Sequence, residues 1–300
     1  GEYEAAIWNG SETGTGFIDW QELYADSGDI TKKTFSCSWE GNSGELTCFY
    51  VRDGVTGLYG WTYDPQIRTW TDLGEVWPGT DIGNEPANIF TCGEDPSTGD
   101  LYHDHIMVMF TDTGTDRLGT VWNGTQFKLT IRPTQDGSTE NVRDDTSACS
   151  WTHDGNTAVI VWVDANSLIP EWGTYSYTSD SFSFSQWDVG STTGMPTWAD
   201  DVESLRISLN PENDEMLLTG IALTTGTLAS DVQCTRWTGS TFDATGCGTV
   251  ESSGNLDVTS GREFTGYADV DLSRYNAPPV VLSLLYPLNN TNITTNLVNF

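Results

Sequence analysis

The chain has 300 residues and carries 43 Asp and Glu against 12 Lys and Arg, which gives a formal net charge of −31. So acidic a surface excludes nucleic acid and anionic membranes as partners, and no segment is suited to membrane insertion. Thr, Ser, Gly, Trp and Tyr are abundant, and no window shows a 3.6-residue apolar period. An all-β fold with very little helix is therefore predicted.

A two-part sequence unit recurs about every 56 residues along the chain. The first part is a short apolar strand that ends in a small residue or Cys, found at residues 33–39, 87–93, 146–151, 203–209 and 262–268. The second part is a strand that bears Trp or Tyr and ends in a tight turn, found at residues 5–11, 59–65, 119–125, 173–179 and 234–240. A fixed period indicates an array of one supersecondary unit rather than unrelated domains.

The order of the two parts predicts how the array closes. The chain begins with a second part and its last repeat ends with a first part, so pairing of the N-terminal strands with the last repeat would complete a fifth blade. We therefore predict a five-bladed β-propeller over residues 1–275, because this closure leaves no raw sheet edges. The 13 Trp and 11 Tyr are expected to pack between blades. The alternative is that some of them form a platform on which sugars stack.

Six Cys residues in a pattern that follows the repeat predict disulfides and an oxidising, extracellular compartment. Two expected bonds join adjacent strands across a hairpin turn, and one joins equivalent strands of consecutive blades if those strands are innermost. The expected pairs are Cys37 with Cys48, Cys234 with Cys247, and Cys92 with Cys149. Metal binding by Cys is the alternative, but it requires a Cys-x-x-Cys spacing that the chain lacks.

Four Asn residues stand in Asn-x-Ser/Thr sequons, namely Asn9, Asn123, Asn289 and Asn292. They are candidate glycosylation sites. Asn9 and Asn123 belong to Trp-Asn-Gly sequences, where a hairpin turn with positive φ at both central residues is the alternative.

Calcium is the candidate ion, although the fold requires none. Asp112 and Asp116 flank a glycine turn, and Asp269 and Asp271 stand two residues apart; each pair offers hard oxygen ligands. The alternative is that these acids are solvated turn residues. His103 and His105 could begin a zinc or copper site, or could simply be polar residues at a strand mouth.

After residue 275 the repeat stops, and residues 276–300 are expected to form an extended β tail. The segment PPVVLSLLYPLNNTNITTNLVNF resembles the opening of an immunoglobulin-like domain of archaeal and bacterial surface proteins. In that family an apolar strand runs into Pro-x-Asn-x-Thr and then a strand that ends Val-x-Phe. The rest of such a domain is missing. The earlier repeats resemble extracellular β-propeller repeats in general.

An incomplete domain cannot fold alone, so we expect the tail to add a strand to the sheet of a neighbouring subunit. The residues expected to make this contact are Val280, Leu282, Leu284, Tyr286, Leu297 and Phe300. A head-to-tail contact of this kind builds rings or filaments.

The sequence thus predicts a structural subunit of an extracellular filament or cell-surface assembly, a homopolymer that is not an enzyme. The alternative is a secreted carbohydrate-binding or adhesive propeller, with glycans as partners. A glycoside hydrolase is less favoured, because no pair of carboxylates stands out among the many acids.

Overall fold

The computed structural model describes residues 2–8, 16–25, 34–52, 54–77, 86–93, 103–112, 116–135, 147–163, 169–183, 190–196, 202–210, 213–224, 229–251, 268–271 and 281–284. Their regular secondary structure is β-strand throughout, and nothing in these ranges forms a helix with the length and hydropathy of a membrane span. The predicted all-β class is confirmed.

Four antiparallel sheets of four strands follow one another along the chain, and the strands of each sheet pair in sequence order. The first sheet contains β3 (Phe35–Trp39), β4 (Leu46–Val51), β5 (Leu58–Asp64) and β6 (Thr69–Trp77). The second contains β7 (Pro86–Gly93), β8 (Ile106–Asp112), β9 (Asp116–Trp122) and β10 (Phe127–Gln135). The third contains β11 (Ser147–Trp151), β12 (Thr157–Trp162), β13 (Glu171–Ser176) and β14 (Ser181–Phe182). The fourth contains β15 (Val202–Leu209), β16 (Glu215–Thr224), β17 (Ala229–Thr238) and β18 (Phe242–Glu251).

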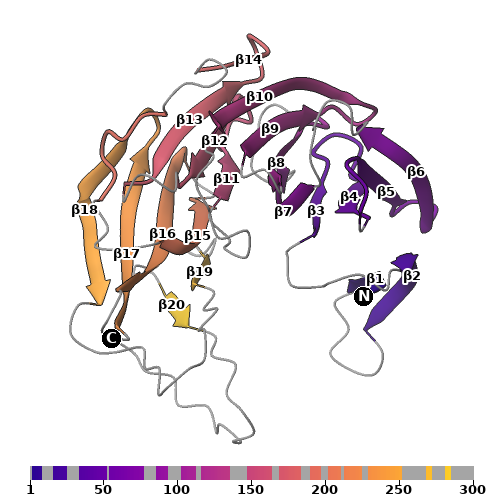
Figure 1. Cartoon of the computed structure of the whole chain (residues 1–300), viewed down its shortest axis with the longest axis horizontal. Helices are drawn as coiled ribbons and strands as arrows, with labels where there is room; N and C mark the ends of the chain where they lie inside the picture. Colours follow the sequence, from indigo (N-terminus) through magenta and orange to yellow (C-terminus); the bar gives the residue numbers. More distant parts are fainter. Residues whose placement is uncertain are drawn as a thin grey trace, which may run out of the picture.

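The sheets are arranged in an arc with the first strand of each sheet innermost (Figure 1). This is the arrangement of propeller blades. At its ends stand two-stranded sheets, β1 (Glu2–Trp8) with β2 (Phe17–Ala25) and β19 (Ala268–Asp271) with β20 (Val281–Leu284). Among the described strands these two end sheets do not pair with each other. The predicted closure and the count of five blades are therefore not confirmed.

The hydrophobic core lies between successive four-stranded sheets. In each of the four sheets, one buried aromatic residue near the end of the third strand occupies the same position in the repeat. In every case it is paired with the first apolar residue of the second strand. The residues at this position are Tyr63, Trp122, Tyr175 and Trp237, each at most 3% exposed. Trp122 packs with residues of the first two sheets, and Trp237 with residues of the last two. The predicted packing of aromatic rings between blades is therefore confirmed for Trp122 and Trp237.

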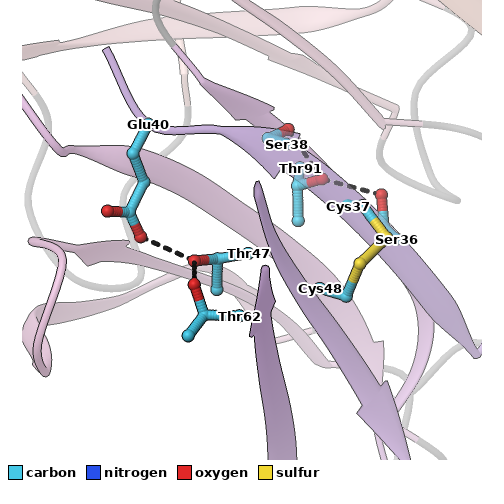
Figure 2. The surroundings of a disulfide bond; sticks show 8 residues. All are labelled: Ser36, Cys37, Ser38, Glu40, Thr47, Cys48, Thr62 and Thr91. Atoms are coloured by element: carbon cyan, nitrogen blue, oxygen red, sulfur yellow. Dashed lines mark hydrogen bonds between the residues drawn. A yellow bond between two sulfur atoms is a disulfide. The ribbon is translucent and has the colours of Figure 1, made fainter. Parts of the chain in front are cut away.

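Two disulfides stand where the repeat predicts them. Cys37 and Cys48 are directly opposite on β3 and β4 (Figure 2). Cys92 and Cys149 join β7 to β11, which links the innermost strands of the second and third sheets. Cys234 is also disulfide-bonded. The side chain of Cys247, its predicted partner, lies outside the described residues.

The tail strand pairs with its own chain. Leu282 is opposite Val270 and Leu284 is opposite Ala268 in the antiparallel β19–β20 pair. The donation of this strand to a neighbouring subunit is thus not supported, because β19 supplies the hydrogen-bonding edge that the sequence analysis assigned to another copy. Four further predicted contact residues lie outside the described part of the chain, namely Val280, Tyr286, Leu297 and Phe300.

Candidate functional site

Two ion pairs occupy equivalent positions between successive sheets. We call the first the Asp19 joint (Asp19, Tyr63, Arg68) and the second the Lys128 joint (Lys128, Tyr175, Asp180). Arg68 and Asp180 each stand two residues before the aromatic residue that pairs with the joint's tyrosine, and both have positive φ, at 56° and 50°. In each joint the other charged residue comes from the outer strand of the preceding sheet, β2 or β10.

The Asp19 joint connects β2 to the first four-stranded sheet. Arg68 donates from Nε to Asp19 Oδ2 at 2.8 Å and from a terminal nitrogen to Oδ1 at 2.7 Å, while the Tyr63 hydroxyl donates to Oδ2 at 2.5 Å. The Trp70 indole donates to the Asp19 carbonyl at 2.7 Å. The hydrogen bonds from Arg68 and Tyr63 hold the pKa of Asp19 below its ordinary value. The carboxylate is therefore ionised and fixed at neutral pH.

Large apolar side chains around this joint are open to solvent. Phe17, Trp20 and Ile67 are 66%, 60% and 69% exposed, and each lies within two residues of Asp19 or Arg68. A β-bulge lies in the strand that carries Trp20, because the β1–β2 register shifts between Ala5 and Ile7 and Asp19 takes φ of 52°. Bulges re-aim the side chains of a strand. We call Phe17, Trp20 and Ile67, with the Asp19–Arg68 pair, the Trp20 patch.

The Lys128 joint connects β10 to the third sheet. Lys128 Nζ lies 3.1 Å from Asp180 Oδ2, and the Tyr175 hydroxyl donates to Oδ1 at 2.6 Å. The hydrogen bond from Tyr175 lowers the pKa of Asp180, supported by Lys128 and opposed by burial. Burial, with the hydrogen bond to Asp180, raises the pKa of Tyr175. Tyr175 is fully buried, whereas the Asp180 side chain is 45% exposed.

Two histidines lie behind the Lys128 joint. His103 stacks on Tyr177 with ring centroids 4.2 Å apart, and its Nε2 lies 2.7 Å from the Gly155 carbonyl. Its Nδ1 accepts the backbone N–H of His105 at 3.2 Å. Lys128 Nζ lies 3.3 Å from His105 Nε2. Burial, followed by the charges of His103 and Lys128, lowers the pKa of His105 to about 4, so it is neutral at pH 7.

The contacts of His103 and His105 can be compared with the zinc or copper site that the sequence suggested as one possibility. Both ring nitrogens of His103 are within hydrogen-bonding distance of the protein backbone. No group of three or more His, Cys, Asp or Glu side chains suited to a metal occurs among the described residues. Asp112 ends β8, Asp116 begins β9, and Asp269 and Asp271 lie on β19, but the positions of their side chains are not described. Calcium binding there stays a prediction.

A buried carboxylate joins the first two sheets. Glu40 is 2% exposed and accepts hydrogen bonds from Thr47 at 2.6 Å and Trp122 at 3.0 Å on Oε1, and from Ser43 at 2.9 Å on Oε2 (Figure 2 shows the Thr47 bond). Burial raises its pKa despite these bonds. Both carboxylate oxygens of Glu40 accept hydrogen bonds, and these bonds connect the first two sheets. Because the side chain is buried, a substrate cannot reach it. Sequence reasoning missed it, although it directly follows a first-part strand.

The sequon at Asn123 forms a tight turn. Asn123 N bonds the Gln126 carbonyl, so Gly124 and Thr125 are the central residues, and Gly124 has φ of 89°. Positive φ at the first central glycine is the type II′ pattern, rather than the predicted turn centred on Asn-Gly. Asn123 Oδ1 accepts the Thr125 amide at 3.1 Å and the Gln126 amide at 2.9 Å. Asn9, Asn289 and Asn292 lie outside the described residues.

Comparison with solved structures identifies β-propeller proteins as the neighbours of this fold. An α-L-arabinanase of Penicillium chrysogenum, complexed with arabinobiose, has a TM-score of 0.52 at 11% identity over 81% of this chain and 72% of its own. An exo-β-1,3-galactanase of Bifidobacterium bifidum scores 0.42 at 9% identity, over 79% and 80% of the two chains. The six-bladed fucose-binding lectin of Aleuria aurantia scores 0.40 at 11% identity, over 75% and 66%. No family model and no curated protein matches the sequence.

The prediction that the protein is not an enzyme is corrected by these structures. The α-L-arabinanase, a glycoside hydrolase, resembles this chain in fold at a TM-score of 0.52. The fold therefore provides no ground for excluding catalysis, and the prediction was wrong to treat a propeller without an obvious carboxylate pair as inert.

Proposed function

We propose that this protein is a secreted carbohydrate-binding β-propeller and that a sugar docks at the Trp20 patch. The observation that carries the proposal is the exposure of Trp20 and Ile67, each next in sequence to a member of the fixed, ionised Asp19–Arg68 pair. Exposed apolar patches rimmed by polar groups are characteristic of binding sites. The C–H face of a sugar ring packs on an aromatic ring, while its hydroxyls bond carboxylate and guanidinium groups.

The charge of the chain narrows the class of sugar. A net charge of −31 repels uronic, sialic and sulfated glycans at a distance, so the ligand is a neutral sugar. At the patch itself the two charges are paired, and the Arg68 side chain is 56% exposed. An exposed guanidinium that is already neutralised favours hydroxyl groups over a second carboxylate.

The finer architecture is part of the proposal. We infer that β1 and β2 are the two outer strands of a fifth blade whose inner strands come from the last repeat. The register supports this, because Trp8 pairs with Phe17 as Trp122 pairs with Phe127. The disulfides support secretion into an oxidising compartment.

A glycan array that presents neutral and acidic oligosaccharides tests the function, with arabinobiose included because the arabinanase of similar fold holds it. We expect binding to neutral sugars, and a loss of about tenfold in affinity for Trp20→Ala. Trp39→Ala is the matched control, because Trp39 is 41% exposed but ends the innermost strand β3. Release of reducing sugar is followed in parallel, since hydrolysis would make the protein an enzyme on the same ligands. A silent array with natively folded protein, or equal losses in the two variants, would overturn the proposal.

A further inference from the structure

We propose that the Lys128 joint is a second binding site for the same class of ligand, a neutral sugar; this inference rests on the proposed function. The two joints are equivalent in the repeat. Tyr63 and Tyr175 occupy one repeat position, and each donates its hydroxyl to the acid of its joint. Arg68 and Asp180 occupy another, each with positive φ at the end of the turn after the third strand.

The charge is reversed between the joints while the geometry is kept. In the first joint the outer strand supplies the acid and the turn supplies the base; in the second the outer strand supplies Lys128 and the turn supplies Asp180. A neutral ligand with several hydroxyls can donate to either carboxylate and accept from either cation. Reversal of the pair therefore preserves the chemistry that a sugar requires.

The Lys128 joint has the remaining parts of a sugar site. Its charged groups are accessible, with side chains 28% exposed for Lys128 and 45% for Asp180. Exposed hydroxyls stand beside them, because Ser179 and Ser181 flank Asp180 and their Oγ atoms are 2.7 Å apart. Tyr177 supplies a half-buried ring at the start of the same turn, held from beneath by His103.

The other two four-stranded sheets lack this arrangement. Where the repeat position is Trp rather than Tyr, the turn is shorter and is centred on residues 124–125 or 239–240. The Trp122 indole donates to the buried Glu40 instead of to a surface acid. The Trp237 indole finds no partner among the described residues. The fourth sheet does expose Arg236, next in sequence to Trp237, at 3.9 Å from Glu215 and 3.7 Å from Asp243, but these three residues belong to one sheet. The ion pair of each joint instead connects two successive sheets and bonds a tyrosine hydroxyl.

The experiment locates binding at each joint separately. Isotope-labelled protein is titrated with the methyl glycosides of arabinose, galactose, glucose, mannose and fucose, and the Trp20 indole and the Asp180 backbone amide are followed by NMR. In the wild type we expect both signals to shift with the same sugar. In Trp20→Ala the Asp180 amide should still shift, and in Tyr177→Ala the Trp20 indole should still shift.

Lys128→Gln serves as a second variant, because it removes the cation from a half-exposed position without opening the core, and it should abolish the Asp180 shift alone. A wild type in which Trp20 shifts and Asp180 does not, or a Lys128→Gln protein with an unchanged Asp180 shift, would overturn this inference and leave the proposed function standing. A wild type in which neither signal shifts with any of the five sugars would overturn both.

Discussion

The Asp19 joint and the Lys128 joint place the same three-residue arrangement in two different surroundings. The Asp19 joint lies at the N-terminal end of the arc and is rimmed by exposed apolar side chains. The Lys128 joint lies in the middle of the arc, is backed by two buried histidines, and belongs to the pair of sheets that the Cys92–Cys149 disulfide links. Because the sign of the charges differs while the geometry does not, the repeat position favours a pair of opposite charges and a tyrosine, not a particular residue.

The difference in surroundings should set how each joint responds to its conditions. Arg68 and Asp19 keep their charges throughout the range near neutral pH, since the pKa of Asp19 is lowered and guanidinium does not titrate. The Lys128 joint adds a histidine whose protonation would place a second cation beside Lys128. The first joint should therefore respond to salt and the second to acid.

The largest effect on stability is expected from removal of the Cys92–Cys149 disulfide, which is found at the Lys128 joint's pair of sheets and not at the Asp19 joint. Replacement of Cys92 and Cys149 by Ser should lower the free energy of unfolding by about 4 kcal/mol, because the bond closes a loop of 57 residues. Replacement of Cys37 and Cys48, which close a loop of 11 residues, should cost about 3 kcal/mol. Urea unfolding of both double variants measures the difference. A smaller loss for the Cys92–Cys149 pair would mean that the second and third sheets do not depend on the bond between their innermost strands.

The second largest effect is expected from low pH, which should lower the free energy of unfolding through the Lys128 joint and not through the Asp19 joint. The pKa of His105 is lowered from 6.5 to about 4, so the unfolded chain binds more protons than the folded chain between these values. Stability should thus fall as pH drops through this window, by about 2 kcal/mol after allowance for solvent screening. The groups that face His105 are His103, Lys128, Asp180 and Asp104. The charges of Asp180 and Asp104 oppose the lowering of the His105 pKa without cancelling it.

Urea unfolding at a series of pH values within this window gives the slope. The variant His105→Gln removes one titrating group and should reduce this slope, while His103, whose pKa is also lowered by burial, should keep part of it. If the slope is the same in wild type and variant, the acid sensitivity belongs to another part of the chain and the contrast between the joints is lost.

Features that repeat along the chain could be predicted from the sequence, whereas contacts outside the repeat, between residues far apart in the chain, could not. The strands and the Cys92–Cys149 disulfide follow from the repeat, because Cys37, Cys92 and Cys149 keep one place within the unit and equivalent innermost strands become neighbours. The Cys37–Cys48 disulfide follows from the hairpin that places these two residues on adjacent strands. The joints could not be found in this way. Asp19 reaches Arg68, 49 positions away, because a bulge turns its strand, and no periodic pattern encodes that contact. The self-pairing of Leu282 and Leu284 was missed for a similar reason, since the edge of β19 exists only once the chain has folded.

The smallest expected effect tests the tyrosine that the joints share. Tyr175→Phe removes the hydroxyl that donates to Asp180, and the loss in unfolding free energy should be about 1.5 kcal/mol, because a hydrogen bond to an ionised group is lost at a fully buried ring. Tyr63→Phe is the matched variant and should cost less, because Asp19 keeps two hydrogen bonds from Arg68 while Asp180 keeps a single contact with Lys128. Thermal unfolding of both variants at low and high salt compares them. Equal losses at every salt concentration would show that the bidentate arginine does not compensate, and that the two joints differ in charge but not in the way they hold their acid.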